Sequence, residues 1–459
     1  MYNRYQYNYP YKKKAARSRL RWVLVLLLVL GIPVGLEFLT RFVTHATGAS
    51  DRFTTNQTST LIDSYRLRFV SGQGQPYVGL PDGGELQAIR DPLLGYRLAG
   101  DQQSSFWQIN ENGFRDLEAV PRAKETGEIR IFVLGGSTAF GQLSTGDQTT
   151  FASQLETRLN DQVAQQRANP DQFQPSVLPF RADQVQAVLA LTPRIRDGQY
   201  RVINAAVPGY ASGNELALLM HRVAAYSPDF VIAFGGYADL MLPSTHLGAD
   251  VPGLDQQLTE GGPSWRADLS KRTHDWFNQL YLVQAIRYYS LGGQQPEPQL
   301  SEPLNLYAAA AEATLSDRLP SDSADLDQRL QRYGDNLQQM VNWASVNQKR
   351  LIIAVEPEIS TRQPEALTPA ESAIVAELEA AYLEQMRTGF AGLATVANQA
   401  GARSANAEVL NLYPLYEDFV GQAFQSPTSL TDEAHTLISD RLYEVIGRQL
   451  ALQPEPFGS

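Results

Sequence analysis

Short apolar runs alternate with longer amphipathic segments from residue 129 almost to the end of the chain. The runs are rich in β-branched side chains, which is typical of strands that are covered on both faces. The segments between them are long enough for helices. This alternation predicts an α/β domain with a doubly wound parallel sheet of about five strands. We expect strands at 129–134, 200–207, 229–234, 351–355 and 409–412, and helices near 150–166, 213–226, 324–348, 369–400 and 433–452.

Two stretches interrupt this alternation. Residues 167–199 are polar and rich in Gln, Pro and Arg, whereas 240–322 combines Pro, Gly and Ser clusters with an aromatic, amphipathic segment at 276–289. Both are expected to follow strand ends, where ligands bind in open α/β sheets. Each is therefore interpreted as an insertion that forms either a lid, a partner surface or a solvated loop. A protein partner, if there is one, is expected at 240–322.

The amino terminus has the pattern of a membrane anchor. Residues 1–21 carry a charge of +7 with no acidic residue, and an apolar stretch follows from Trp22. A helix over 22–42 is long enough to span the hydrocarbon core, and the basic residues before it place the N-terminus in the cytoplasm. The rest of the chain is then periplasmic or extracellular. The alternative is a cleaved signal peptide, although no Ala-x-Ala site is present near Ala46 and Ala49.

The segments after the anchor complete the expected domain organisation. A linker rich in Thr, Ser, Asn and Gly is expected at 43–60. Short extended pieces at 61–128 predict an N-terminal extension that packs on the core, and the main domain is placed at 129–455.

Charge and composition narrow the class of function. The chain has a net charge of −11, so residues 22–459 carry −18, which is a poor match for nucleic acid. The absence of cysteine excludes disulfides and thiolate chemistry. The five histidines show no close ligand spacing, so no metal centre is predicted. The basic tail is expected to contact anionic lipid.

Candidate chemistry lies where the first strand of the domain ends. Two glycines, Gly135 and Gly136, permit a tight turn, and Ser137 follows at once. This is either a nucleophile presented at the edge of the sheet or an ordinary helix N-cap. A serine nucleophile needs an imidazole base and a carboxylate that orients the imidazole. Asp432 and His435 share one face of the last helix and are the candidates, although the spacing taken alone favours an ordinary first-turn acid at Asp432.

Four segments in order resemble the SGNH, or GDSL-type, hydrolase superfamily. They are Gly-Gly-Ser137-Thr-x-Phe-Gly141, Asn204-Ala-Ala-Val-Pro-Gly209, Gly236-Tyr-Ala-Asp239 and Asp432-x-x-His435. The segments Leu94–Arg97 and Asn112–Arg115 also resemble a prefix that precedes this domain in secreted bacterial members. The resemblance implies a flavodoxin-like fold and hydrolysis of an acyl ester through an acyl-serine. It implies neither a metal nor an organic cofactor.

The resemblance also implies a role for each matched residue. Ser137 would be the nucleophile, His435 the base and Asp432 its orienting acid, while the N–H groups of Ser137 and Gly209 would form the oxyanion hole. The sequence departs from the family at Ala238, where an Asn side chain would be the third donor. Losing one such donor costs on the order of 10²–10³ in turnover. The leading prediction is a membrane-anchored esterase acting on acylated glycan or a small ester. The alternatives are an inactive SGNH-like envelope protein that binds glycan or a protein, and an O-acyltransferase.

Overall fold

The computed structural model describes residues 57–72, 74–77, 84–251 and 315–457. The chain divides into two units, and the second, residues 61–263 with 298–459, contains nearly all of the described part. The predicted anchor at 22–42, the linker and most of the insertion at 240–322 lie outside the described residues. No helix among the residues that were described has the length and apolar character needed to cross a membrane.

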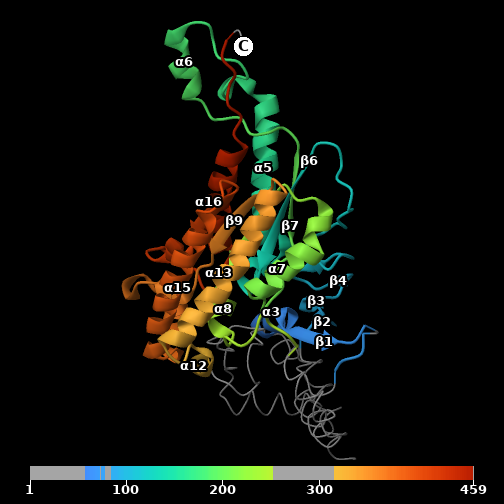
Figure 1. Ribbon diagram of the computed structural model, residues 1–459, viewed down its shortest axis with the longest axis vertical. Coiled ribbons are helices and arrows are strands. Elements are labelled where there is room, and N and C mark those ends of the chain that lie inside the picture. Colours follow the sequence, from blue (N-terminus) through green and yellow to red (C-terminus); the bar gives the residue numbers. More distant parts are fainter. Residues whose placement is uncertain (1–56, 73, 78–83, 252–314, 458–459) are drawn as a thin grey trace, which may run out of the picture. The chain divides into compact units, whose positions relative to one another are not determined.

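A five-stranded parallel sheet forms the centre of the second unit (Figure 1). The strand order is β10-β9-β8-β6-β7, and every neighbouring pair is parallel. Every residue of β6 and β8 is buried, as the unbroken apolar runs predicted. The strands are β6 (Glu128–Gly135), β7 (Gln199–Asn204), β8 (Phe230–Gly235), β9 (Arg350–Val355) and β10 (Ala407–Asn411).

Helices cover both faces of the sheet, which confirms the predicted doubly wound parallel sheet. One face carries α5 (Phe151–Ala168) and α16 (Asp432–Leu450), which pack on each other. The other face carries α7 (Ser212–His221), α13 (Ser323–Val346) and α15 (Ala380–Gly401). The chain leaves β6 for β7 on one side and then returns to β8 on the other. The carboxyl end of β6 therefore lies at the topological switch point, where ligands bind in open α/β sheets.

Shorter elements connect this framework. The helices are α4 (Ser137–Phe140), α6 (Ala182–Leu189), α8 (Tyr237–Met241), α12 (Leu315–Arg318) and α14 (Pro369–Glu377). Single 3-10 turns lie at Asp147–Thr149, Pro170–Gln172, Val223–Tyr226, Ile359–Thr361, Pro364–Ala366 and Tyr413–Tyr416.

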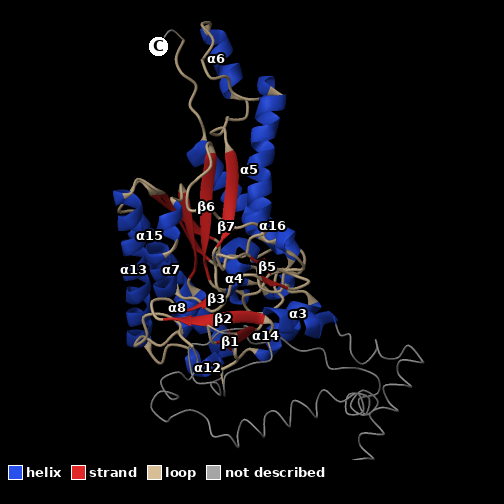
Figure 2. Cartoon of the chain, turned by 90° about the vertical axis from the view of Figure 1, so that its right-hand side faces the viewer, coloured by secondary structure: helices blue, strands red, loops and turns tan. Residues whose placement is uncertain are grey.

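The described residues between 61 and 127 form a small layer at the carboxyl edge of the main sheet (Figure 2). Two side chains fasten this layer to the edge: the Tyr96 hydroxyl donates to Pro208 O at 2.8 Å, and the Tyr65 hydroxyl donates to Ser144 O at 2.8 Å. The elements are α3 (Gln57–Tyr65), β1 (Leu67–Val70), β2 (Leu86–Asp91), β3 (Gly95–Leu98), β4 (Gln102–Gln103) and β5 (Gln108–Ile109).

Two sequence-based expectations need correction. The single helix expected at 369–400 is two helices, α14 and α15, because Leu378 and Glu379 adopt extended backbone angles between them. The insertion at 167–199 follows α5 and precedes β7, so it lies at the amino ends of the strands rather than at the ligand-binding edge. It cannot form a lid over Ser137 from that position.

Candidate functional site

The turn that carries Ser137 follows directly from β6. Gly135 has a φ of 153°, a conformation that side chains rarely permit, and any Cβ at this position would collide with Phe234 O of the neighbouring strand β8. Ser137 then opens α4 and is partly exposed. Its hydroxyl has no hydrogen-bond partner among the described residues, so the side chain is free to meet a ligand.

The loop after β7 runs beside this turn. A Cβ added to Gly136 would lie 3.0 Å from Tyr210 O, which places the loop containing Gly209 against the turn. Gly209 has a φ of 87°, and within the described structure its N–H donates to no acceptor. The Asn204 amide ties the loop to α4 by donating to Ala139 O at 3.0 Å. The predicted oxyanion donors, Ser137 and Gly209, are therefore brought to the same edge.

Arg115 holds the chain segment that follows Ser137. Its side chain is 1 % exposed and donates six hydrogen bonds. The acceptors are Asp147 Oδ1 at 2.7 Å, Phe140 O and Gly141 O at 2.9 Å, Phe106 O at 3.0 Å, and Tyr65 Oη and Ser144 Oγ at 3.1 Å. Arg115 ends the Asn112–Arg115 segment noted in the sequence. The sequence pattern marks this segment, but no local signal predicts that its arginine supports the Ser137 turn.

The described part of the third segment offers no free side-chain donor at the edge. Ala238 is buried and has no polar side chain. The Tyr237 N–H donates to Glu356 Oε1 at 2.8 Å, and the Tyr237 hydroxyl bonds the Tyr382 hydroxyl at 3.1 Å. The Asn214 amide donates to Leu94 O and Ala249 O at 2.9 and 2.8 Å. Neither Tyr237 nor Asn214 replaces the missing donor in this arrangement.

The predicted pairing of Asp432 with His435 is not formed. Asp432 accepts the Thr145 N–H at 3.1 Å and also binds the Thr145 hydroxyl. His435 is fully buried and stacks on Phe151, with ring centroids 5.9 Å apart. Within the described part of the chain, neither of its ring nitrogens has a hydrogen-bond partner, so His435 contacts neither Asp432 nor the Ser137 hydroxyl through them.

The register of α16 explains this outcome. Thr431 caps the helix, so Asp432 occupies its first turn near solvent, whereas His435 joins the buried stripe that continues through Ile438 and Leu442. Burial lowers the pKa of His435 to about 4; the charge of Arg115 lowers the pKa further, and the charge of Asp432 opposes the shift without overcoming it. His435 is therefore a neutral core residue at pH 7 in this structure.

The loop at 426–429, which precedes α16, lies against the turn that carries Ser137. The Thr138 hydroxyl donates to Thr428 O at 3.0 Å, which brings the turn at 426–429 beside Ser137. Within this turn the Ser429 N–H donates to Ser426 Oγ at 2.9 Å. Ser426 and Ser429 have the same spacing as Asp432 and His435, but both are hydroxyl residues. Neither hydroxyl is able to act as a strong base at neutral pH.

Buried carboxylates lie after β9. Burial raises the pKa of Glu356 to about 7 and that of Glu358 to about 7. Glu356 also interacts with the side chain of Thr138, while Glu358 accepts the Tyr382 hydroxyl at 3.0 Å and the Ser360 N–H at 2.8 Å. Their oxygens are engaged by these donors, so they serve to hold the loops of the carboxyl edge.

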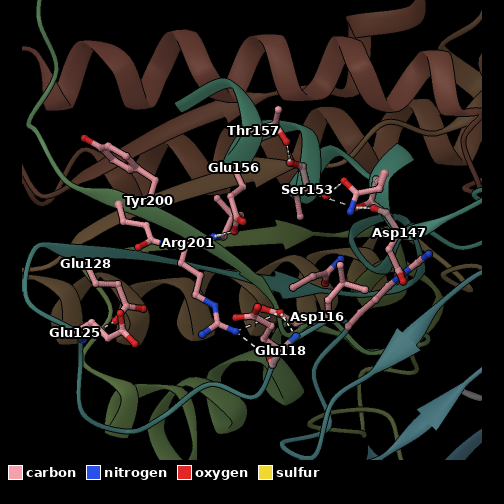
Figure 3. A pocket seen from close by; sticks show the side chains of 18 of the residues that line it. Asp116, Glu118, Glu125, Glu128, Asp147, Ser153, Glu156, Thr157, Tyr200 and Arg201 are labelled. Atoms are coloured by element: carbon pink, nitrogen blue, oxygen red, sulfur yellow. Dashed lines mark hydrogen bonds and ion pairs between the residues drawn. The ribbon is translucent and has the colours of Figure 1, made fainter. Parts of the chain in front are cut away.

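A separate cleft of about 340 Å³ opens beside β7 (Figure 3). Arg201 pairs with Asp116 at 3.3 Å in this cleft, and Glu156 accepts the outward-facing N–H of Val202 at 2.7 Å. These side chains cover the free edge of the sheet, which prevents pairing with another strand. Arg115 also lines the cleft, but Ser137, Gly209, Asp432 and His435 do not.

Comparisons with known proteins give remote structural likenesses. No protein-family model matches this sequence, and no curated protein is similar to it. Among solved structures, an acetyl xylan esterase is 11 % identical and has a TM-score of 0.31, with 69 % of this chain and all of that chain covered. A catalytic variant of an acetylxylan esterase from Geobacillus stearothermophilus is 12 % identical, with a TM-score of 0.33 and coverage of 70 % and 94 %.

A third structure is an α/β hydrolase enzyme from the metagenome of Lake Arreo, Spain. It is 10 % identical and has a TM-score of 0.30, with 71 % of this chain and 96 % of that chain covered. Two of these proteins are named as acetyl xylan esterases and the third as an α/β hydrolase. At such low sequence identity, the function of this chain has to be argued from the residues of its own site.

Proposed function

We propose that this chain is an SGNH-like protein of the cell envelope that binds an acyl-bearing ligand at Ser137 without turning it over. One observation carries the proposal: the Ser137 hydroxyl has no base beside it. His435 is buried in the core, and the loop that faces the turn offers Ser426 and Ser429. A serine hydroxyl without a base is a weak nucleophile. The free N–H of Gly209 and the hydroxyl of Ser137 remain as hydrogen-bonding groups for an ester carbonyl.

We infer the cellular location of this protein from its sequence. The basic tail and the apolar stretch at 22–42 favour a single-pass anchor, with the domain outside the cytoplasmic membrane. Acylated envelope glycan is the ligand class that we infer, because the structurally similar proteins include enzymes named for acetylated xylan.

A fluorophosphonate probe tests the proposal on the full chain in detergent. Such probes label serines that a neighbouring base activates. We expect wild type and Ser137→Ala to be labelled equally weakly, and we expect wild type to bind an acetylated xylo-oligosaccharide more tightly than its deacetylated form. Ser137-dependent labelling would overturn the proposal. Failure to bind any acylated sugar or small ester would remove the ligand-binding part of it.

The second candidate is a serine esterase or O-acyltransferase. It is favoured by the partly exposed Ser137 hydroxyl beside the Gly209 N–H. This function requires a base to reach Ser137 when substrate binds. Strong labelling that disappears in both Ser137→Ala and His435→Phe would support it, and product analysis with an added sugar acceptor would then separate transfer from hydrolysis.

A further inference from the structure

Three buried carboxyl groups interact with one another at the carboxyl edge of the sheet. Glu215 lies on α7, Asp239 lies on α8 and Glu356 directly follows β9. The charges of Asp239 and Glu356 act on Glu215, and the charge of Asp239 also acts on Glu356. A Cβ added to Gly235 would lie 2.7 Å from Glu215 Oε1, so this carboxyl contacts the last residue of β8. We call these three residues the carboxyl cluster.

Asp239 holds the end of the loop that contains Gly209. Its Oδ2 accepts the Ser212 N–H at 2.9 Å, and its Oδ1 accepts the Ser212 hydroxyl at 2.6 Å. Asn336 donates to Ser212 Oγ at 2.9 Å, which leaves the hydroxyl hydrogen for Asp239. Because Ser212 is the first residue of α7, these bonds fix the point where the Gly209 loop enters the helix.

Glu356 holds the turn that carries Ser137. Glu356 Oε1 accepts the Tyr237 N–H at 2.8 Å, and the Glu356 carboxyl also interacts with the side chain of Thr138. The Thr138 hydroxyl has one hydrogen, which it donates to Thr428 O at 3.0 Å, so it meets Glu356 with its lone pairs. A protonated carboxyl can donate to them, whereas a carboxylate only accepts. When Glu356 ionises, Thr138 therefore keeps only one of its two contacts.

The surroundings of the cluster favour the protonated form of Glu356. Burial raises the pKa of Glu356 to about 7, and it also raises the pKa of Glu215 and that of Asp239. Arg332 is the cation whose charge acts on Asp239, but its guanidinium donates to four backbone carbonyls. None of the three carboxyls forms a salt bridge in the described part of the chain. The other ionisable groups around the cluster are Tyr237 on α8, Asp325, Arg329 and Tyr333 on α13, Glu358 after β9 and Tyr382 on α15.

We propose that the carboxyl cluster is a proton-dependent latch: protonated Glu356 holds the Ser137 turn and the Gly209 loop together, and loss of its proton to water releases them. The latch controls ligand binding at Ser137, so this role rests on the proposed function. A group whose pKa is raised in the closed site stabilises the closed site fully at low pH. For Glu356 this contribution is lost as the pH rises from 4.5, the usual pKa of Glu, toward 7. The site therefore holds its ligand most tightly in a mildly acidic medium.

Hydrogen exchange of the full chain in detergent, measured by mass spectrometry, tests the latch without a ligand. Peptides that cover 136–142 and 205–212 are compared between wild type and Glu356→Gln at the same pH, so that the chemical exchange rate is identical. Gln stays neutral and can donate to the Thr138 hydroxyl as a protonated Glu does. We expect the ratio of wild-type to variant exchange to rise at least about ten-fold from pH 4.5 to pH 7.5, because each unit in this range changes the opening equilibrium by up to about ten-fold.

Glu358→Gln is the matched control. Glu358 is also fully buried and its pKa is also raised to about 7, but it binds Tyr382 and Ser360 instead of the Ser137 turn. We expect Glu358→Gln to exchange like wild type in both segments at both pH values. A ratio that does not change with pH, or the same response in both variants, would overturn the latch.

Wild type alone provides a second measurement if Glu356→Gln does not fold by circular dichroism. Protection of 136–142 and 205–212, corrected for the chemical exchange rate, is expected to fall between pH 4.5 and pH 7.5 while the protection of α5 stays constant. Equal changes in all three segments would contradict the latch, since they would report a general loss of stability.

Binding of an acetylated xylo-oligosaccharide over the same pH range connects the latch with the proposed function. We expect the wild-type Kd to rise at least about ten-fold from pH 4.5 to pH 7.5, and that of Glu356→Gln to change by less than about two-fold. Wild-type binding that does not depend on pH would refute control by the latch. If wild type binds nothing at any pH while its exchange still follows Glu356, the proposed function fails and the latch stands.

Discussion

The two sides of the Ser137 site differ in the chemical groups that they offer to a ligand. On one side, the turn after β6 and the loop after β7 keep a partly exposed hydroxyl and a free backbone N–H, supported by Arg115 and Asn204. On the other side, the loop at 426–429 presents hydroxyls where a proton acceptor would be needed. Backbone and hydroxyl groups that could bind a carbonyl lie on the first side, whereas among the described residues the second side has no side chain able to take the Ser137 proton. The proposed function therefore separates binding of an ester from its turnover.

Restoring a base to the facing loop is the strongest test of this difference. Ser426→Asp/Ser429→His places a carboxylate and an imidazole at the Asp-x-x-His spacing in the loop that contacts Thr138. General base catalysis contributes on the order of 10²–10⁴ in rate. We expect a gain of that order in p-nitrophenyl acetate hydrolysis, measured on the full chain in detergent.

Two controls define the gain from the restored base. Adding Ser137→Ala to the double variant is expected to abolish the gain, and Ser426→Asp alone is expected to show none. Because Ser429 is fully buried, circular dichroism must first show that the double variant is folded. A folded double variant no faster than wild type would contradict the assignment of this loop as the place for a base.

Removing Arg115 tests the side of the site that carries Ser137 and Gly209. Arg115→Leu leaves Asp147 and two carbonyls behind the Ser137 turn without their donor. Breaking a buried charge pair by removing one partner costs about 3–5 kcal/mol. We expect a loss of that size in the free energy of unfolding, measured in urea. The control is Arg158→Ala, whose ion pair with Asp440 is roughly 40 % exposed and is expected to be worth less than about 1 kcal/mol. Equal losses would show that Arg115 does not support the turn.

The sequence was sufficient for the main sheet because apolar runs and glycine positions largely determine it. The apolar runs predicted all five strands of the main sheet, and the glycines marked the turn at Gly135 and the loop at Gly209. Both features follow from local backbone requirements that are visible in the residues themselves.

The base could not be located in the same way, because an Asp-x-x-His spacing does not tell which way a helix faces. The apolar residues Ile438, Leu442 and Ile446 form a stripe that includes His435, and this stripe was the available signal that His435 points into the core. The contact between Thr138 and Thr428 joins residues 290 positions apart, and no local pattern predicts it.

His435 offers a pH test of its core position. Its pKa of about 4 in the folded chain lies below the value of 6.5 for an exposed histidine, so the unfolded chain binds more protons between these pH values. Its contribution to stability is complete above pH 6.5 and is lost as the pH falls toward 4. Relative to His435→Phe, wild type should lose about 3 kcal/mol over this range, at about 1.4 kcal/mol per pKa unit.

Urea unfolding of both proteins at pH 7.5, 6, 5 and 4 measures the difference. Glu356 and Glu358, whose pKa values are raised, shift stability in the opposite direction in both proteins, so their effect cancels. A difference in unfolding free energy that does not change with pH would mean that His435 is not a buried neutral group.

Asp432→Asn is expected to have the smallest effect, and this separates the two interpretations of the residue. As a first-turn acid bound to Thr145, Asp432 contributes through the helix dipole and two exposed contacts, together worth about 1 kcal/mol or less. As the orienting acid of a catalytic triad, its amide substitution would cost about 10⁴ in turnover. We therefore expect Asp432→Asn to unfold within 1 kcal/mol of wild type and to leave the activity of the Ser426→Asp/Ser429→His variant unchanged. A large loss of that activity would show that Asp432 acts as the orienting acid. The side of the Ser137 site formed by the loop at 426–429 and α16 would then not lack groups that take part in proton transfer.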